Sequence, residues 1–225
     1  MAATRTRSGK RTRRAGRPSG DDGDLRARLL DVATALYARA GIDATSLRAI
    51  AAEAGVTPAM LHYYFGDKAR LTQALIDERL LPALAPMRAG LAQAGDEPAA
   101  LAEAFARGIG ELVARHPWLP PLWVREVLCE GGALREVLFH QALPNLPRLL
   151  AGRFAAAQAQ GRLDPELDPR LLVVSLVGLT MFPAAGAPIW RAVFEAGDID
   201  AGVLLRHTLA LLRCGLGTRP EGKTP

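Results

Sequence analysis

Apolar residues recur at intervals of three and four along most of the chain, which is the spacing that gathers them on one face of an α-helix. Stretches that alternate every second residue, as in a half-buried strand, are not convincing anywhere. The pattern therefore predicts an all-α protein. The expected helices cover residues 25–40, 45–54, 58–64, 68–81, 101–116, 124–130, 134–143, 146–160, 169–182 and 199–214.

Residues 45–68 contain two short helices joined by a tight turn, with a third helix starting at the end. Thr45 is expected to cap the first helix, and Gly55 to end it, because glycine accepts the left-handed conformation common at helix C-termini. Thr57 and Pro58 then form a start signal, a capping hydroxyl followed by a proline at the first helical position. The second helix has only about seven residues and needs a scaffold to be stable.

The residues in and around this unit form a signature that extends beyond the turn. They are Leu29, Leu30, Ala33, Leu36, Tyr37, Gly41, Thr45, Ser46, Ile50, Ala51, Ala54, Gly55, Val56, Leu61, Tyr64, Phe65, Lys68 and Leu71. In this register the sequence closely resembles the helix-turn-helix of the TetR (tetracycline-repressor-like) transcriptional regulators. The resemblance implies a three-helix DNA-binding domain followed by a larger helical domain for ligand binding and dimerisation.

The resemblance implies that the second short helix contacts the base pairs of DNA and that neighbouring groups contact phosphates. His62 stands where the family has tyrosine, and residues 58–60 lack the Arg, Gln or Asn that pairs bidentately with a base, so the operator sequence stays open. Lys68 is favoured as a phosphate contact over a solvated lysine. One of Tyr63 and Tyr64 is expected in the core and the other at DNA. The full set of expected DNA contacts is Thr45, Arg48, Thr57, Pro58, Ala59, Met60, His62, Tyr63, Tyr64 and Lys68.

Residues 171–190 contain no charged side chain, which by length alone suits a membrane span. Pro183, Gly186 and Pro188 interrupt the run after about three turns, so we interpret it instead as a helix, capped by Asp168, that is buried from both sides. The second side is expected to be another subunit. Helices 169–182 and 199–214, the latter capped by Asp198, are the predicted homodimer interface, which pairs two heads on a palindromic operator in double-stranded DNA.

The charge is uneven along the chain. Residues 1–20 carry seven basic and no acidic residues, so the remaining 205 sum to −2 out of a total of +5. The basic segment is interpreted either as a disordered arm or as a polycation lying along phosphates, and both can hold together. The predicted organisation is an arm at 1–20, the DNA-binding domain at 21–68, the effector-binding and dimerisation domain at 69–216, and a disordered tail at 217–225.

The two cysteines, Cys129 and Cys214, have no Cys or His at metal-ligand spacing. We therefore expect no zinc, no other metal and no cofactor, and a reduced protein of the bacterial cytoplasm, associated with the nucleoid when bound to its operator. The N-terminus is charged but lacks the apolar segment of a secretory signal, and no membrane association is expected.

A small effector is expected to bind in the region between the DNA-binding domain and the C-terminal helices. The proportion of apolar and aromatic candidates favours a hydrophobic or amphipathic molecule whose binding releases a repressor from DNA. For each candidate the alternative is packing in the core or at a surface corner. The candidates are Phe105, Trp118, Trp123, Arg125, Phe139, His140 and Trp190.

Two rival functions compete with the regulator. An all-α enzyme would use His116, Glu126, Glu130 and His140, but their spacing matches neither a metal site nor a catalytic triad, so we predict that the protein is not an enzyme. A non-specific, nucleoid-like DNA-binding protein would depend on the basic arm rather than on the reading helix. An activator or a co-repressor-dependent factor is also compatible with the sequence.

Overall fold

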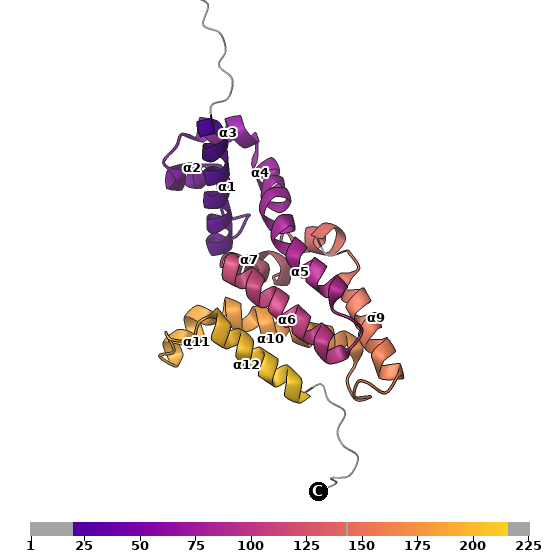
Figure 1. The fold of residues 1–225 in the computed structure, drawn as a ribbon. Helices are drawn as coiled ribbons and strands as arrows, with labels where there is room; N and C mark the ends of the chain where they lie inside the picture. The colour runs from indigo at the N-terminus through magenta and orange to yellow at the C-terminus, as the bar shows by residue number, and fades with distance from the viewer. Residues whose placement is uncertain (1–19, 143, 216–225) are drawn as a thin grey trace, which may run out of the picture.

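The computed structural model describes residues 20–142 and 144–215, and this part of the chain is helical without a strand (Figure 1), which confirms the all-α prediction. We call α1–α4 the head and the remaining helices the body. The head comprises α1 (Gly20–Ala40), α2 (Leu47–Ala54), α3 (Pro58–Phe65) and α4 (Lys68–Leu75). The body comprises π-helical η1 (Ile76–Leu80), α5 (Leu81–Gln93), α6 (Pro98–Arg115), α7 (Leu119–Trp123), η2 (Val124–Leu128), α8 (Arg135–Val137), η3 (Leu138–Ala142), α9 (Leu146–Ala159), α10 (Pro169–Ala185), α11 (Ala187–Val193) and α12 (Ala201–Gly215).

The head folds around the apolar face of α1. Leu29, Leu30 and Tyr37 are completely buried there, and Leu61 and Phe65 reach the same core from α3. These positions repeat at helical spacing, so the sequence pattern and the packing agree. Tyr37 is therefore a packing residue of the head core.

The chain passes from head to body without a break in helical structure, whereas the sequence pattern placed a helix end near Leu81 and Pro82. The π turn of η1 removes that break, because the Leu81 N–H bonds to the Ile76 carbonyl, five residues back. Pro82 lies in this continuous helix and has no N–H to donate to the carbonyl of Glu78. The Glu78 carbonyl, four residues before the proline, accepts instead from Arg79 Nη1 at 3.1 Å.

Charged side chains also join α1 to η1. Arg26 makes a two-pronged ion pair with Glu78, at 2.5 and 2.6 Å. The hydrogen bonds from Arg26 hold the pKa of the Glu78 carboxyl below its usual value. Arg79 reaches back to Asp31 at 2.7 Å. The head is therefore fixed to η1 by side chains as well as by the backbone.

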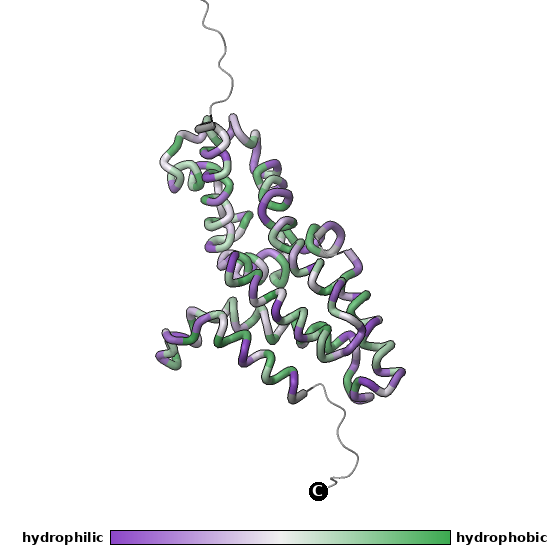
Figure 2. Tube along the Cα trace, viewed as in Figure 1, coloured by the Kyte–Doolittle hydropathy of each residue, from purple (hydrophilic) through white to green (hydrophobic). Residues whose placement is uncertain are grey.

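In the body, α6 packs against α5, α10 and α12, and α10 also packs against α9. Helices α10–α12 lie at the end of the molecule opposite the reading head (Figure 1), and the hydropathy colouring of this layer is green along much of its length (Figure 2). Asp168 caps α10 as predicted, its carboxylate accepting from Arg170 N at 2.8 Å. The helix continues to Ala185, past the predicted end at Phe182.

The predicted cap of the last helix at Asp198 is wrong. Asp200 accepts from Val203 N at 2.8 Å, and α12 begins at Ala201 rather than at Ile199. The reason is a turn closed by the hydrogen bond from the Ile199 N–H to the Ala196 carbonyl at 3.3 Å. Asp198 lies inside this turn, so the helix begins after it.

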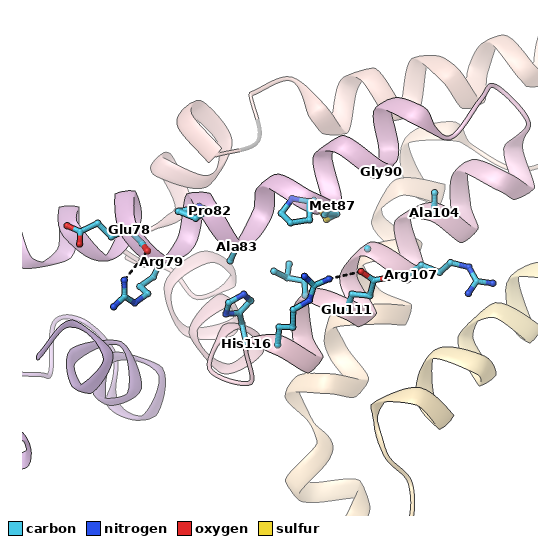
Figure 3. Close-up of a pocket in the computed structure, with 14 residues that line it drawn as sticks. Glu78, Arg79, Pro82, Ala83, Met87, Gly90, Ala104, Arg107, Glu111 and His116 are labelled. Carbon is cyan, nitrogen blue, oxygen red and sulfur yellow. Dashed lines mark hydrogen bonds and ion pairs between the residues drawn. The ribbon is translucent and has the colours of Figure 1, made fainter. Parts of the chain in front are cut away.

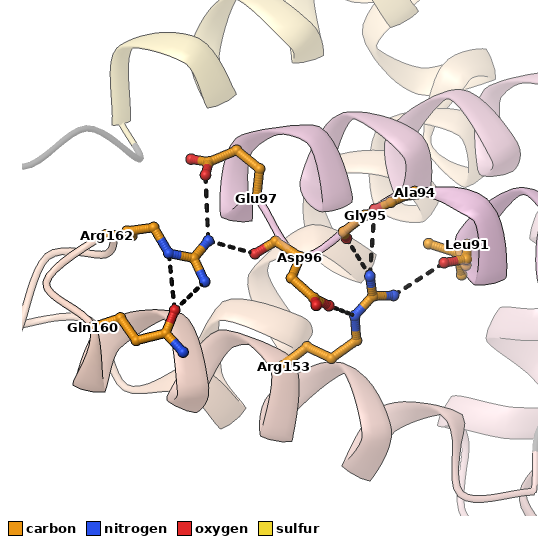
Figure 4. A network of polar contacts seen from close by, with 8 residues as sticks. All are labelled: Leu91, Ala94, Gly95, Asp96, Glu97, Arg153, Gln160 and Arg162. Carbon is orange, nitrogen blue, oxygen red and sulfur yellow. Dashed lines mark hydrogen bonds and ion pairs between the residues drawn. The ribbon is translucent and has the colours of Figure 1, made fainter.

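One arginine of α9 binds the loop between α5 and α6. The Arg153 guanidinium in α9 donates to the carbonyls of Leu91 (3.0 Å), Ala94 (3.3 Å) and Gly95, and pairs with the Asp96 carboxylate at 3.0 Å (Figure 4). A positive group at the C-terminus of α5 satisfies carbonyls that lack intrahelical partners.

Replacing Arg153 by alanine is expected to lower the free energy of unfolding by about 2–3 kcal/mol, because several hydrogen bonds from a charged donor disappear together and carbonyls are left unpaired. Urea denaturation followed by circular dichroism measures the change. Arg148→Ala, an exposed arginine of the same helix, is the matched control and should stay within about 0.5 kcal/mol of the parent. Equal stability of the two variants would show that the guanidinium contributes nothing to joining these helices.

Candidate nucleic-acid interface and cavity

Helix α2 begins with a cap that differs from the predicted one. Ser46 Oγ accepts from Ala49 N at 3.1 Å and caps α2. Thr45 is only 3% exposed, and its hydroxyl donates to the Gly41 carbonyl at 2.6 Å. Its side chain therefore closes the loop after α1 and is not on the surface where DNA would lie. Gly55 ends α2 with φ of 68°, as predicted.

Helix α3 rests on its scaffold by two side chains, Leu61 and Phe65, which are buried in the head. Thr57 occupies the N-cap position, but the predicted capping hydrogen bond from its hydroxyl is not formed. Its backbone carbonyl accepts from Met60 N at 3.0 Å instead. Seen from outside, α3 presents the exposed side chains of Thr57, Pro58, Ala59, His62 and Tyr63, with Met60 half-buried.

The two tyrosines of α3 divide as the sequence pattern predicted. Tyr63 is 79% exposed, whereas Tyr64 is half-buried against the head core. Their rings meet edge to face with centroids 5.1 Å apart. The inner ring thus supports the outer one. Next to them, His62 Nδ1 lies 2.5 Å from the Gly66 carbonyl, which makes Nδ1 the donor and turns this ring back towards the end of the helix.

Two basic groups flank α3. Lys68 opens α4, which Asp67 caps by accepting from Arg70 N at 2.8 Å. Lys68 Nζ donates to the Asp43 carbonyl at 2.9 Å and so spans from α4 to the loop after α1. Arg48 is exposed on the first turn of α2. The outward groups of the head are thus hydroxyls, aromatic rings and cations, a combination suited to phosphates and base edges.

An apolar cavity of about 210 Å³ lies in the middle of the body, among α5, α6, α7, η2, α9 and α10. Each described residue that lines it is apolar, and leucine predominates. Its wall includes Phe105 from α6, Trp123 and Val127 on either side of the α7–η2 junction, and Val177 from α10. The cavity therefore offers dispersion contacts but, apart from the Trp123 indole N–H, no described side chain that hydrogen-bonds or carries charge.

Of the predicted effector contacts with described side chains, Phe105 and Trp123 reach this cavity, whereas Trp118, Arg125, His140 and Trp190 do not. Trp118 packs edge-on against His116 at 5.6 Å. Arg125 is exposed, and His140 is exposed with Nε2 3.0 Å from the Glu136 carboxylate. Trp190 belongs to α11, where its indole N–H donates to the Pro183 carbonyl at 2.8 Å. The side chain of Phe139 lies outside the described part of the chain.

The leucines that form most of the cavity wall were not among the predicted effector contacts. They come from helices with ordinary apolar faces, so nothing in the spacing separates a leucine that fills a core from one that borders a void. A weak signal was present in η2, where Val127 and Leu128 follow Trp123 in an apolar run that the charges of Arg125 and Glu126 interrupt.

Comparison with known proteins identifies the head. Residues 29–75 match the family model of the bacterial regulatory proteins of the tetR family. These residues form a tetR-family DNA-binding domain. No curated protein sequence matches the chain. The family covers transcription regulators, so the outward face of α3 belongs to a helix-turn-helix that binds DNA.

Solved structures extend the similarity of fold to the body. The ketosteroid transcriptional regulator KstR2 of Mycobacterium tuberculosis is 19% identical, with 92% of this chain and 100% of that chain covered and a TM-score of 0.68. The fatty acid degradation regulator FadR from Bacillus halodurans is 21% identical, with coverages of 90% and 100% and a TM-score of 0.60. A regulator of the TetR/AcrR family from Thermobifida fusca YX-ER1 is 23% identical, with coverages of 85% and 98% and a TM-score of 0.56.

The body also has an open groove of about 450 Å³ between α5 and α6 (Figure 3). Met87 and Leu112 line both the groove and the apolar cavity. The groove is lined by charged side chains as well, and Arg115 is paired with Glu111 at 2.7 Å. Burial, aided by the charge of Arg115, lowers the pKa of His116. This groove is a solvated surface feature whose described charges are partly neutralised by each other.

The residues considered for catalysis have separate partners. His116 borders the groove, Glu126 is bound to backbone N–H groups at the junction of head and body, and His140 pairs with Glu136. Among the described residues no group of three His, Cys, Asp or Glu side chains is placed to hold a metal ion. The family model and the similar structures are named for regulatory proteins.

In the described part of the chain, none of the helices is on its own both long enough and apolar enough to cross a membrane. Helices α10 and α11 meet the length and composition criteria only when taken together, and they are bent by 67° relative to each other.

Proposed function

We propose that the protein is a homodimeric repressor that binds a palindromic operator through α3 and leaves it when a small hydrophobic molecule enters the apolar cavity. The observation that carries this proposal is the exposed outer face of α3, presented at the end of the head farthest from the body (Figure 1). Such a repressor acts in the bacterial cytoplasm, at the nucleoid. The proposed contacts are Arg48, Thr57, Pro58, Ala59, Met60, His62, Tyr63, Tyr64 and Lys68.

The dimer is supported by apolar side chains on the surface of the C-terminal layer. Val174 and Phe182 of α10 are 65% and 73% exposed, and Leu211 of α12 is 47% exposed. Ile189 and Val193 of α11 are 72% and 68% exposed. We propose that these side chains form one patch, and large exposed apolar patches mark protein–protein interfaces. A second copy related by a two-fold axis would cover the patch on both chains at once and set the two reading helices about 34–36 Å apart, or a multiple of that.

The chemistry of the cavity supports a hydrophobic effector. A carboxylate or phosphate inside it would lose its hydration without gaining a partner, which is strongly unfavourable. Its volume of about 210 Å³ lies below the roughly 300–1,000 Å³ common for small-molecule sites, which favours a compact ligand. Two of the similar structures are named for ketosteroid regulation and fatty acid degradation. Both names point to hydrophobic metabolites.

The test begins with DNA selected by the full-length protein from a random duplex library. The proposal expects a palindromic consensus, and expects compact uncharged hydrophobic compounds to weaken binding to it by 5- to 150-fold, which corresponds to about 1–3 kcal/mol of coupling. Sugars and phosphate esters of similar size form the control panel. Selection of no consensus would refute the operator, and release by the control panel of sugars and phosphate esters alone would refute the hydrophobic effector.

A second candidate, a non-specific DNA-binding protein, is favoured by the seven basic residues of segment 1–20. Deleting residues 2–19 separates the two functions. For a repressor, the deletion should reduce the dependence of log K on log salt concentration, by up to about 0.9 for each phosphate that the segment neutralises, and keep the preference for the selected palindrome. A non-specific binder would instead lose its affinity for DNA with the deletion and keep it in Tyr63→Ala. Fluorescence anisotropy between 50 and 300 mM salt, roughly the range over which such slopes are resolved, measures both quantities.

A further inference from the structure

A buried carboxylate in the body bonds to the backbone of the head. Glu126 lies in η2 and is only 6% exposed. Its Oε1 accepts from the backbone N–H of Ile42 at 2.8 Å, and its Oε2 accepts from the backbone N–H of Ala133 at 3.0 Å. Ile42 belongs to the loop that follows α1 of the head, whereas Ala133 belongs to the turn that follows η2 in the body.

Two glycines make room for this arrangement. A Cβ atom at Gly41, whose φ is +93°, would lie 3.2 Å from Glu126 Oε1. A Cβ atom at Gly132 would lie 2.3 Å from the backbone oxygen of Glu126, closer than real Cβ contacts. The chain therefore approaches Glu126 from the head and from the body at positions where a side chain would block it.

Packing alone does not explain an acid here. A buried carboxylate gives up hydration, and an apolar side chain of similar size would fill the space at less cost. Among the described ion pairs none involves Glu126. Its compensation is the pair of charge-assisted bonds to main-chain N–H groups. What the residue type provides is a direct link between two backbones.

The neighbours of Glu126 along the chain line the apolar cavity, although Glu126 itself does not. Trp123, Val127 and Leu128, which surround Glu126 along the chain, line the cavity. So does Leu134, whose N–H donates to the Glu126 carbonyl at 3.1 Å. The segment is π-helical, a form in which one turn carries an extra residue and which often occurs at functional sites. A shift of the cavity wall at η2 therefore displaces the carboxylate and, through it, Ile42.

We propose that Glu126 is a positioning residue that transmits the state of the apolar cavity to the DNA-reading head by binding Ile42 and Ala133 with one carboxylate. This inference rests on the proposed function, since it assigns the route by which a ligand in that cavity changes DNA binding. The carboxylate touches neither the ligand nor the DNA. It couples two segments that each site depends on.

The test compares the full-length protein with Glu126→Gln, which keeps the shape but has one oxygen acceptor and an NH2 group that faces an N–H donor. Glu130→Gln, an exposed acid one turn later, is the matched control. The probe is 1-N-phenylnaphthylamine, an uncharged apolar fluorophore. Three quantities are measured with and without it: fluorescence binding, affinity for the selected operator, and amide hydrogen exchange at Ile42.

In the parent and in Glu130→Gln, the probe should change both operator affinity and Ile42 exchange by at least fivefold. Glu126→Gln should bind the probe within twofold of the parent, while both changes shrink below twofold. If the carboxylate merely stabilised the fold, Glu126→Gln would lower operator affinity both with and without the probe. The ratio of these two affinities would then equal that of the parent. Equal ratios in Glu126→Gln and the parent would therefore overturn the proposal.

The outcomes for the link and for the repressor are separable. Operator release without a change at Ile42 overturns the link and keeps the repressor, and a change at Ile42 that depends on Glu126 without operator release does the reverse. If the probe does not enter the cavity, Val177→Ala changes the opposite wall, and its effect on Ile42 exchange must still vanish in Glu126→Gln. If Glu126→Gln does not fold, Ala133→Pro removes the body-side N–H, while its ring also fixes φ at residue 133, and this variant must show the same loss of coupling.

Discussion

Replacing Val174 by glutamate is expected to turn the dimer into monomers and to weaken operator binding by at least 100-fold. The side chain lies on α10 with 65% of its surface exposed in the single chain, so the substitution does not disturb the fold of one subunit. In a two-fold dimer it places two carboxylates in an apolar interface, at a desolvation cost of several kcal/mol for each ion. Light scattering at about 10 µM protein gives the mass, and fluorescence anisotropy gives the operator affinity.

Leu149→Glu is the matched control, because Leu149 is an apolar residue with 59% exposure on α9, away from the C-terminal layer. It should remain dimeric and bind the operator as the parent does. A dimeric Val174→Glu would show that the two subunits meet elsewhere. A monomeric variant with full operator affinity would show that one head is sufficient.

Removing the outer aromatic ring of α3 is expected to weaken operator binding by roughly 30- to 150-fold in Tyr63→Ala. The ring is 79% exposed and rests edge-on against Tyr64. A loss of about 1–1.5 kcal/mol at each half-site acts twice in a dimer, and about 1.4 kcal/mol corresponds to a factor of ten. Because the ring is on the surface, thermal stability should change by less than about 0.5 kcal/mol.

Tyr63→Phe identifies which part of the side chain matters. If the hydroxyl bonds a phosphate, the phenylalanine variant will be as weak as the alanine variant at every sequence. If the ring packs on a base, the phenylalanine variant will resemble the parent, and the alanine variant will lose preference at one position of the half-site. Unchanged affinity in Tyr63→Ala would remove α3 from the interface.

The reading unit could be predicted because its signals are local. The end of α2 needs a left-handed backbone, which Gly55 accepts without strain. Pro58 is suited to the first turn of α3, where its missing N–H has no intrahelical partner to lose. The choice between neighbouring hydroxyls could not be predicted in this way. Thr45 and Ser46 are both good caps, and the decision depends on the Gly41 carbonyl, which binds Thr45 after the chain has turned. Tertiary contacts decide between locally equivalent residues.

The continuous helix through η1 and the residues of the apolar cavity could not be predicted from the sequence pattern, for different reasons. Pro82 is a valid stop signal, and η1 overrides it with a π turn that no spacing rule anticipates. Trp190 is a plausible ligand contact by residue type, yet α11 turns it away from the cavity to bond with Pro183. Glu126 was considered only as a catalytic acid, because a carboxylate that bridges two backbones has no signature in the chain.

Hydroxyl-radical footprinting of the full-length protein on the selected duplex tests the central claim most directly. With α3 in the major groove of each half-site of a dimer, two equivalent protected patches should lie on one face of the DNA, with centres roughly 34–36 Å apart or a multiple of that distance. A single patch, protection that does not repeat with two-fold symmetry, or the same weak protection on unrelated DNA would contradict it.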